Sequence, residues 1–188
     1  MSCAKCWIPP ITDYIGYYED CMSENVCDEI MYHDWKMQKS TYSNNEGKSK
    51  TSDERVEMDE VWVMKDMPYY DDIKKVVLKT IKKYSNQHKN FSCQRHTDFR
   101  INKYSEGGFM SEHVDNIHHS HGQQYGYPQV SVLLYLNDDY EGGEFFVAKE
   151  MFLPKKGSAI IFPSNFMYPH EAKTVTKGTR WSAVTWLM

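Results

Sequence analysis

The chain has 188 residues, of which 40% are hydrophobic and 26% are charged, proportions that are ordinary for a globular domain. Its 22 basic and 26 acidic residues give a net charge of −4, so it lacks the basic excess of a general nucleic-acid binder. No apolar run is long enough to cross a bilayer, and residues 1–10 contain no apolar segment typical of a secretion signal. We therefore expect one cytoplasmic domain over residues 1–188 that binds neither membrane nor nucleic acid.

The five cysteines, an odd number, are expected to be reduced thiols in such a compartment. Cys3 and Cys6 have the C-x-x-C spacing of half a zinc site, and Cys21 and Cys27 could supply the other half. A lone C-x-x-C pair is weak evidence, so ordinary thiols are the favoured interpretation and a structural zinc site is the alternative.

The N-terminal half, about residues 1–97, is expected to be a helical support. After an extended aromatic segment over residues 7–20, Ser23 is a candidate N-cap for a helix that reaches about Lys36. Asp71 to about His88 carries apolar residues at helical spacing with lysines on much of the other face, which predicts an amphipathic helix. Val61–Met64 is a short strand candidate.

Residues 40–55, from Ser40 to Arg55, are almost wholly polar and predict a mobile loop. Long loops in compact domains often act as lids or binding loops. A flap that covers a bound substrate and a surface excursion without a role are equally compatible with this composition.

From residue 98 the pattern changes to short β-rich runs separated by Gly, Pro and Asn/Asp turns. The expected strands are Phe99–Tyr104, Gln129–Leu136, Glu144–Ala148, Ser158–Phe162 and Thr179–Leu187. A helical first half followed by many short strands predicts an α+β fold, with a two-sheet jelly roll over about residues 98–188 and helices packed outside.

The candidate site begins at His113-Val114-Asp115, because residues i and i+2 of an extended chain point to the same face. His170 supplies a possible third ligand from the region after the Ser158–Phe162 strand. Two histidines and one carboxylate leave coordination positions open, an arrangement typical of non-haem iron(II) oxygenases. His118, His119 and His121 form a second cluster, but they lie in a polar stretch that favours an exposed loop over another metal site.

Arg180 begins the last strand and shares a face with Ser182, Val184 and Trp186. An inward arginine in a small barrel would be a costly unpaired charge, so it needs an anion. A guanidinium matches a carboxylate with two hydrogen bonds. A keto acid that chelates iron and presents its far carboxylate to Arg180 would satisfy these constraints.

These motifs, taken together, resemble the prolyl 4-hydroxylase branch of the 2-oxoglutarate/iron(II) dioxygenases over about residues 98–188. The resembling elements are H-x-D, Tyr135-Leu136-Asn137, Gly142-Gly143-Glu144-Phe145, Gly157-x-x-Ile160-Ile161-Phe162-Pro163, His170, and Gly178-x-Arg180-x-Ser182 with Trp186. The resemblance implies a double-stranded β-helix (jelly-roll) fold.

The resemblance also implies roles for individual residues. It implies Fe(II) ligation by His113, Asp115 and His170, and binding of the far carboxylate of 2-oxoglutarate by Arg180. Tyr104 and Tyr135 are similar to tyrosines that contact 2-oxoglutarate in relatives, although strand tyrosines are more often core residues. Trp186 matches an inward tryptophan near the metal, and Ser182 could touch the carboxylate or simply be packed. The co-substrates implied are 2-oxoglutarate and O₂, with ascorbate as a possible supporting reductant.

The implied activity is hydroxylation of a substrate C–H bond with release of succinate and CO₂. A peptidyl proline in a protein or peptide is the first choice of substrate, and a lysyl residue or a free amino acid is the alternative. The nucleic-acid branch carries a second arginine six residues after the first, where this chain has Trp186. A catalytically dead jelly-roll binding module is the alternative from a different class, although such a module has no need of intact ligands and Arg180.

Overall fold

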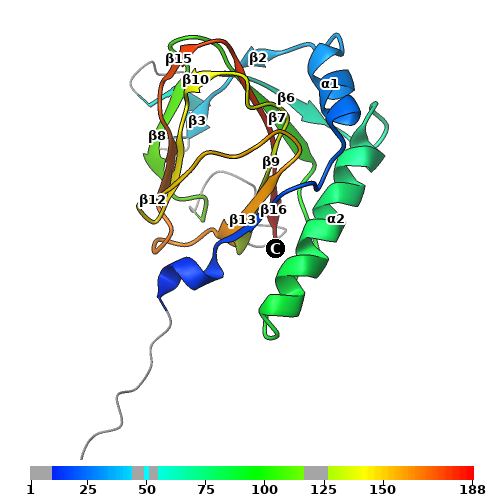
Figure 1. The fold of residues 1–188 in the computed structure, drawn as a ribbon, viewed down its shortest axis with the longest axis vertical. Helices are drawn as coiled ribbons and strands as arrows, with labels where there is room; N and C mark the ends of the chain where they lie inside the picture. The colour runs from blue at the N-terminus through cyan, green and yellow to red at the C-terminus, as the bar shows by residue number, and fades with distance from the viewer. Residues whose placement is uncertain (1–9, 44–48, 51–54, 117–126) are drawn as a thin grey trace, which may run out of the picture.

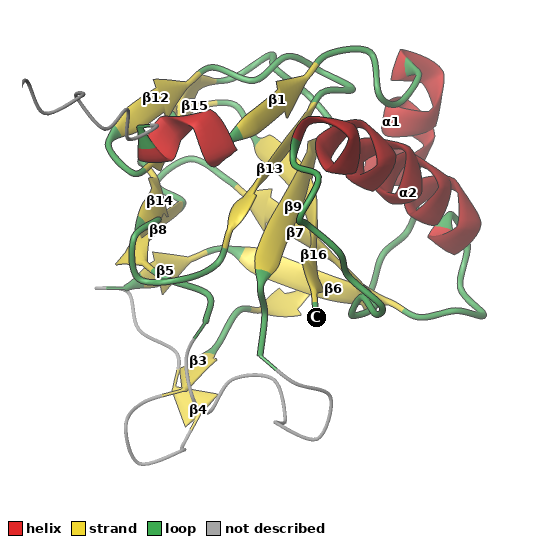
Figure 2. Ribbon diagram, turned by 90° about the horizontal axis from the view of Figure 1, so that it is seen from below, coloured by secondary structure: helices red, strands yellow, loops and turns green. Residues whose placement is uncertain are grey.

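The computed structural model describes residues 10–43, 49–50, 55–116 and 127–188, which form two packed β-sheets with the α-helices on one side (Figures 1 and 2). These residues include a 3-10 helix, η1 (Ile11–Tyr14), and two α-helices, α1 (Glu24–Tyr32) and α2 (Tyr70–Gln87). This agrees with the expected α+β class. Within the described ranges, no helix combines the length and the apolarity needed to cross a membrane.

The larger sheet is antiparallel and contains the longest strands. In spatial order it consists of β1 (Gly16–Tyr18), β13 (Ala159–Pro163), β9 (Val130–Tyr135), β16 (Arg180–Leu187), β7 (Phe99–Tyr104), β6 (Asp59–Val63) and β2 (Gln38–Lys39). The neighbouring strands in space are far apart in sequence, as a jelly roll requires.

The smaller sheet faces the larger one. Its order is β12 (Glu150–Phe152), β11 (Phe145–Val147), β14 (His170–Ala172), β8 (Phe109–His113) and β5 (Val56–Glu57). Two short ribbons complete the strands: β10 (Glu141–Gly142) pairs with β15 (Val175–Lys177), and β3 (Tyr42–Ser43) pairs with β4 (Ser49–Lys50).

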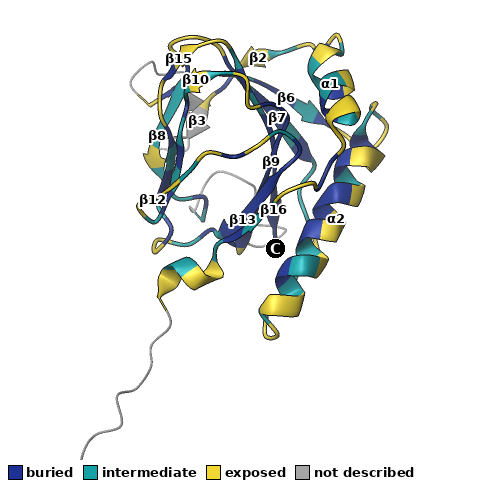
Figure 3. Ribbon diagram, in the orientation of Figure 1, coloured by how far each residue is buried: buried dark blue, intermediate teal, exposed yellow. Residues whose placement is uncertain are grey.

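The central strands β9, β13 and β16 of the larger sheet are buried on both faces, which explains their near-continuous apolar sequences. On β9, Val132 and Leu134 belong to the core under the helices, whereas Leu133 and Tyr135 belong to the core between the sheets. Helix α2 turns one face, including Ile73, toward the outer side of this sheet and leaves its lysine-rich face exposed (Figure 3). The inner faces of the two sheets are therefore free to build a site.

Several expected elements are confirmed, and three need correction. The segment over residues 7–20 was expected to be extended, but Ile11–Tyr14 within it forms the 3-10 helix η1. The Phe99–Tyr104 strand has the expected bounds, and the second helix differs by one residue at each end. The first helix was expected to reach Lys36 but ends at Tyr32, because His33 is extended and the indole of Trp35 turns back to donate a 2.6 Å hydrogen bond to the carbonyl of Ile30.

The third correction concerns residues 40–55, which were expected to be a loop throughout. Tyr42–Ser43 and Ser49–Lys50 pair as a small antiparallel ribbon. Residues 44–48 and 51–54 lie outside the described residues, so the flap hypothesis stays a prediction. Cys3, Cys6 and the three histidines at 118, 119 and 121 also lie outside them, whereas Cys21 and Cys27 are buried free thiols.

Gly157, just before β13, lies against the backbone of Cys21 and Met22 and so helps to attach the N-terminal segment to the larger sheet. It has a φ of +75°, and a Cβ at this position would lie 2.3 Å from the carbonyl oxygen of Met22. Its own carbonyl accepts hydrogen bonds from the backbone amides of Cys21 and Met22. The glycine thus allows two backbone segments to approach more closely than any side chain permits.

We predict that Gly157→Ala lowers the free energy of unfolding by roughly 3 kcal/mol or more, since it adds a backbone clash to the 1–2 kcal/mol cost of a left-handed conformation. Urea denaturation measures the change. Gly107→Ala is the matched control, because Gly107 has a φ of +83° with nothing within 4 Å of the added Cβ. Equal losses in the two variants would contradict the close-approach explanation.

Candidate active site

The two histidines expected from the sequence are cross-strand neighbours on the smaller sheet. Strand β8 ends at His113 and β14 begins at His170, and these residues are paired in register. Their ring centroids lie 4.2 Å apart. Asp115 lies just beyond the end of β8, where the chain leaves the sheet, and is 8% exposed.

The three side chains point their ligand atoms at one location. Nε2 of His113 lies 3.5 Å from Oδ1 of Asp115, and Nε2 of His170 lies 3.3 Å from Oδ2. The ligand atoms of all three residues lie within 4.8 Å of one another. Ligands bonded at about 2.1 Å to one ion, at right angles, are about 3 Å apart, so the spacing fits a transition-metal ion with little adjustment.

Hydrogen bonds from the surroundings orient all three side chains. Nδ1 of His113 lies 2.8 Å from the carbonyl of Ser111, and Nδ1 of His170 lies 3.2 Å from the carbonyl of Tyr168. Carbonyls only accept, so each Nδ1 carries the proton and Nε2 is free to bind a metal. Ser131 donates a 2.6 Å hydrogen bond to Asp115, and its hydroxyl also lies 2.8 Å from that of Ser164.

The charges within the triad are mutually stabilising. Burial alone would raise the pKa of Asp115, but its interactions with the neighbouring His170 and His113 hold it well below its usual value. Burial alone would lower the pKa of His170, but the Asp115 carboxylate raises it. The carboxylate is therefore ionised and ready to serve as a ligand.

Arg180 lies on the facing sheet with its side chain directed into the same cavity, as the sequence predicted. The residue is 1% exposed. Its Nη2 lies 3.4 Å from the hydroxyl of Tyr135, and its guanidinium centre lies 4.9 Å from the ring centroid of Tyr104 and 5.1 Å from that of Tyr135. Burial raises the pKa of both tyrosines, so their hydroxyls stay protonated and can donate hydrogen bonds.

The guanidinium is not fully satisfied. Its buried Nε has no hydrogen-bond partner among the described residues, and neither has the hydroxyl of Ser182. No described carboxylate forms an ion pair with Arg180. A buried, positively charged group with an unused donor fits the carboxylate end of a bound co-substrate.

One cavity joins the triad to Arg180. Its lining comprises Arg100, Asn102, Tyr104, Met110, His113, Asp115, Leu133, Phe145, His170, Ala172, Arg180, Val184 and Trp186. Of the expected co-substrate residues, Tyr104 and Trp186 line it directly, and Tyr135 reaches it through Arg180. The structure thus brings together all seven residues singled out from the sequence.

Sequence reasoning missed several residues of this site. Arg100 and Asn102 line the cavity on the inward face of β7, and Tyr140 is a third tyrosine whose hydroxyl interacts with Arg180. The alternation of side chains along a strand could have found two of them, since Tyr104 and its i−2 and i−4 neighbours share a face. Ser131 and Tyr140 carry no comparable signal.

We predict that each of His113→Ala, Asp115→Ala and His170→Ala weakens binding of Mn(II), a redox-stable probe, by more than about 100-fold. Changes to groups that only orient ligands cost roughly 10–100-fold, and Ser131→Ala should fall in that range. Isothermal titration calorimetry measures the affinities. Glu112→Ala, which removes an exposed carboxylate beside His113 on β8, should bind Mn(II) as the wild type does. Unchanged affinity in any triad variant would refute the metal site.

Known proteins resemble this chain in sequence over the part that carries the site. Residues 99–188 match the family model described as the 2OG-Fe(II) oxygenase superfamily. Prolyl 3-hydroxylase 2 of Homo sapiens is 41% identical over 69 residues, which is 33% of this chain and 10% of that protein. A PKHD-type hydroxylase of Thermosynechococcus vestitus is 35% identical over 93 residues, or 46% of this chain and 41% of the relative. The chain therefore spans less than half the length of these curated relatives.

Solved structures resemble nearly the whole chain. A viral collagen prolyl hydroxylase from Paramecium Bursaria Chlorella virus-1, solved as a 2OG complex, has a TM-score of 0.69 at 18% identity and covers 93% of this chain and 95% of its own. A prolyl hydroxylase from Trichoplax adhaerens, in complex with a hypoxia inducible factor peptide fragment, has a TM-score of 0.71 at 16% identity, with coverages of 94% and 84%. At these identities the likeness establishes the double-stranded β-helix fold.

Proposed function

We propose that this chain, whose residues 99–188 match the family model of the 2OG-Fe(II) oxygenase superfamily, is an Fe(II)- and 2-oxoglutarate-dependent dioxygenase that hydroxylates a C–H bond. One observation carries the proposal. Two imidazoles and a carboxylate converge within 4.8 Å, in a cavity that also holds a buried arginine with an unused donor. That combination provides for a metal ion and for an anionic co-substrate at once.

Each residue has a distinct task in this proposal. His113, Asp115 and His170 hold Fe(II), and their grouping on one side leaves positions for 2-oxoglutarate and O₂. Arg180 binds the far carboxylate of 2-oxoglutarate, and the hydroxyls of Tyr104 and Tyr135 can add hydrogen bonds to the co-substrate. Trp186 lines the cavity toward the end away from Arg180.

The bound metal and co-substrate supply the oxidising chemistry: one atom of O₂ enters the substrate C–H bond, and the other enters succinate as 2-oxoglutarate loses CO₂. The protein contributes ligands, orientation and a cavity lined mostly by buried side chains. Ascorbate as a supporting reductant, a single domain over residues 1–188 and a cytoplasmic location stay predictions from the sequence.

A peptidyl proline is the substrate we favour. The support is the resemblance to proteins named prolyl 3-hydroxylase 2 and to solved prolyl hydroxylases, one of them holding a peptide. A lysyl residue or a free amino acid is the alternative within the same chemistry. A binding module with an inactive metal site is the alternative from another class, and it would form no succinate.

The direct test combines two measurements. The purified protein with Fe(II), ascorbate and 2-oxoglutarate is assayed for succinate, and a peptide library is searched by mass spectrometry for a gain of one oxygen atom. We expect succinate formation that increases when proline-containing peptides are present. Absence of succinate under all of these conditions would exclude the dioxygenase.

We predict that Arg180→Ala raises the dissociation constant for 2-oxoglutarate by more than tenfold, because removing one partner of a buried charged pair typically costs about 2–5 kcal/mol. The affinity is measured by titrating 2-oxoglutarate into the Fe(II)-loaded protein without oxygen and following the change in visible absorption. Mn(II) binding should stay near the wild-type value. Arg180→Lys keeps the charge without the guanidinium fork, so its dissociation constant for 2-oxoglutarate should fall between those of the wild type and Arg180→Ala. Unchanged 2-oxoglutarate affinity in Arg180→Ala would place the carboxylate elsewhere.

A further inference from the structure

A second arginine, Arg100, lies at the other end of the active-site cavity. On β7, Arg100, Asn102 and Tyr104 alternate onto the inward face, and all three line the cavity. In the pairing of β7 with β16, Tyr104 is opposite Arg180 and Arg100 is opposite Val184. Four residues of strand span about 13 Å, so Arg100 is well separated from the Arg180 end.

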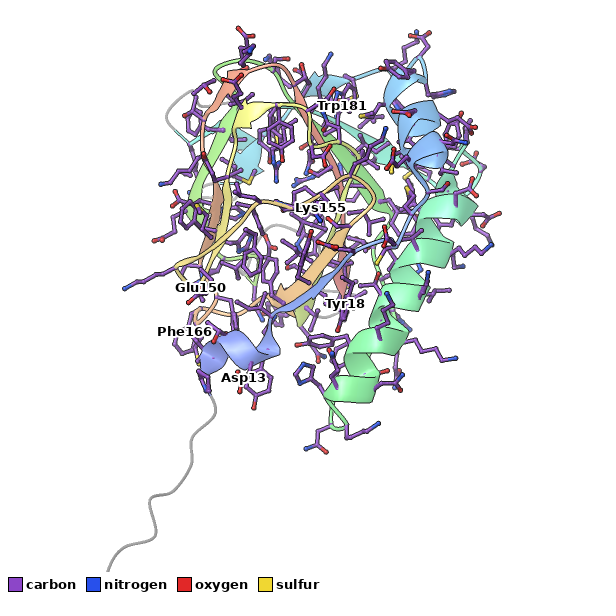
Figure 4. The ribbon with its side chains drawn as sticks, in the orientation of Figure 1. Asp13, Tyr18, Glu150, Lys155, Phe166 and Trp181 are labelled. Carbon is purple, nitrogen blue, oxygen red and sulfur yellow. The ribbon has the colours of Figure 1, made fainter. Side chains whose placement is uncertain are left out.

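The direction of the strands relates these two ends to the whole molecule. Trp181, next to Arg180, lies at the end of the sandwich opposite Asp13 and Phe166 (Figure 4). Strand β16 runs from there toward the C-terminus (Figure 1) and passes Val184 and Trp186 on its inward face. If 2-oxoglutarate is anchored at Arg180, the substrate must approach the metal from the part of the cavity that Arg100 and Trp186 line.

Arg100 is held firmly in this position. Its guanidinium centre lies 5.0 Å from the ring centroid of Trp186, and that ring packs beside Trp62. Its Nη1 lies 3.4 Å from Oε2 of Glu60, whose side chain is only 9% exposed. Ser40 fixes the same carboxylate oxygen with a 2.7 Å hydrogen bond. Stacking and charge pairing together set the orientation of the guanidinium.

One donor of this guanidinium remains unused. The buried Nε of Arg100 has no hydrogen-bond partner among the described residues, and the buried Oδ1 of Asn102 is also unpaired. Leaving a buried polar group unsatisfied is unfavourable, and native structures contain few such groups. Here a donor and an acceptor lie two residues apart on one strand face, beside the cavity, where a ligand could satisfy them.

The charge around Arg100 restricts what that ligand can be. Glu60 already neutralises the guanidinium, in contrast to Arg180, which has no ion-pair partner among the described residues. A carboxylate brought to Arg100 would also be repelled by Glu60. A neutral acceptor loses nothing to this repulsion and still gains a hydrogen bond from a charged donor.

We infer that Arg100 is a specificity-determining residue that donates a hydrogen bond to a backbone carbonyl of a peptide substrate, and that Glu60 disfavours free amino acids by cancelling the charge that would bind their carboxylate. This inference rests on the proposed dioxygenase function and narrows its substrate class to peptides. The amide oxygen of Asn102 is placed to accept from a peptide N–H on the same substrate.

The test compares two probes, a proline-containing peptide with acetylated and amidated ends and free L-proline. The wild type is expected to hydroxylate the blocked peptide in preference to free L-proline. Arg100→Met should raise the KM for the blocked peptide roughly tenfold or more, with a smaller effect on kcat. Glu60→Gln leaves the charge of Arg100 uncancelled, so it should raise the ratio of kcat/KM for free L-proline to that for the blocked peptide by about tenfold.

Two further variants separate substrate binding from damage to the fold. Glu60→Gln combined with Arg100→Met removes both charges, so it avoids stranding a buried carboxylate and should still show the raised KM. Lys103→Met is the matched control: it removes a cation from the same strand, but Lys103 lies over the ring of Trp181 and not in the cavity. Its KM for the blocked peptide should equal that of the wild type.

The outcomes distinguish this inference from the proposed function. If the wild type forms no succinate from 2-oxoglutarate, the dioxygenase proposal itself fails. If the wild type is active but Arg100→Met and the double variant keep the wild-type KM, Arg100 serves only to hold Trp186 and the inference is wrong. An active wild type that prefers free L-proline, or that hydroxylates neither probe, also overturns it.

Discussion

The buried guanidinium of Arg180 is the constraint on which the site depends. Moving a charge out of water costs several kcal/mol even after the protein relaxes, and a partner must offset this cost. Around Arg180 the described residues provide aromatic rings and tyrosine hydroxyls but no paired carboxylate. Gly143 lets the backbone approach so closely that a Cβ there would lie 3.1 Å from the arginine Cδ. Among the described residues, the surroundings thus hold a cation without a counter-charge, and on the proposed function the co-substrate carboxylate supplies it.

The two histidines of the metal triad lie on the smaller sheet, opposite Arg180 on the larger sheet. A hydrogen bond from Ser131 links the triad to the larger sheet. His113 and His170 are positioned by the pairing of β8 with β14, whereas Asp115 lies beyond the strand end and has no ladder to hold it. Ser131, on β9 of the larger sheet, donates to the Asp115 carboxylate across the space between the sheets. The position of the third ligand therefore depends on how the two sheets pack, and the same packing sets its distance from Arg180.

The length of each strand or helix decides whether the sequence could predict it. Strands β9, β13 and β16 are long and apolar enough for their patterns to be recognised, and α2 is a strongly amphipathic helix. Strands β14 and β15 have three residues each, too few for any periodicity, so the elements around His170 could not be read from the sequence. The triad was predictable only because the combination of H-x-D, His170 and Arg180 resembles a family.

Other features required coordinates because they depend on contacts distant in sequence. Helix α1 ends just before the point where Trp35 packs against His33 and Tyr69. No local sequence signal predicts this end of the helix. The ion pair of Arg100 with Glu60 joins the neighbouring strands β7 and β6. It matters to the site because Arg100 also lines the cavity. A sequence pattern can place Arg100 on an inward face, but it cannot say which carboxylate neutralises it.

The two arginines make the two ends of the cavity differ in net charge. At an effective dielectric constant of about 20, two unit charges about 5 Å apart interact by about 3 kcal/mol. No ion-pair partner among the described residues competes for Arg180, so an anion placed there gains an attraction of this size. At Arg100, the attraction is largely cancelled by repulsion from Glu60, which lies at 3.4 Å from the guanidinium. On the proposed function, an anionic co-substrate is therefore directed to the Arg180 end, and the Arg100 end is left for a neutral chain. We propose that Glu60 in this way disfavours binding of the co-substrate in the reverse orientation.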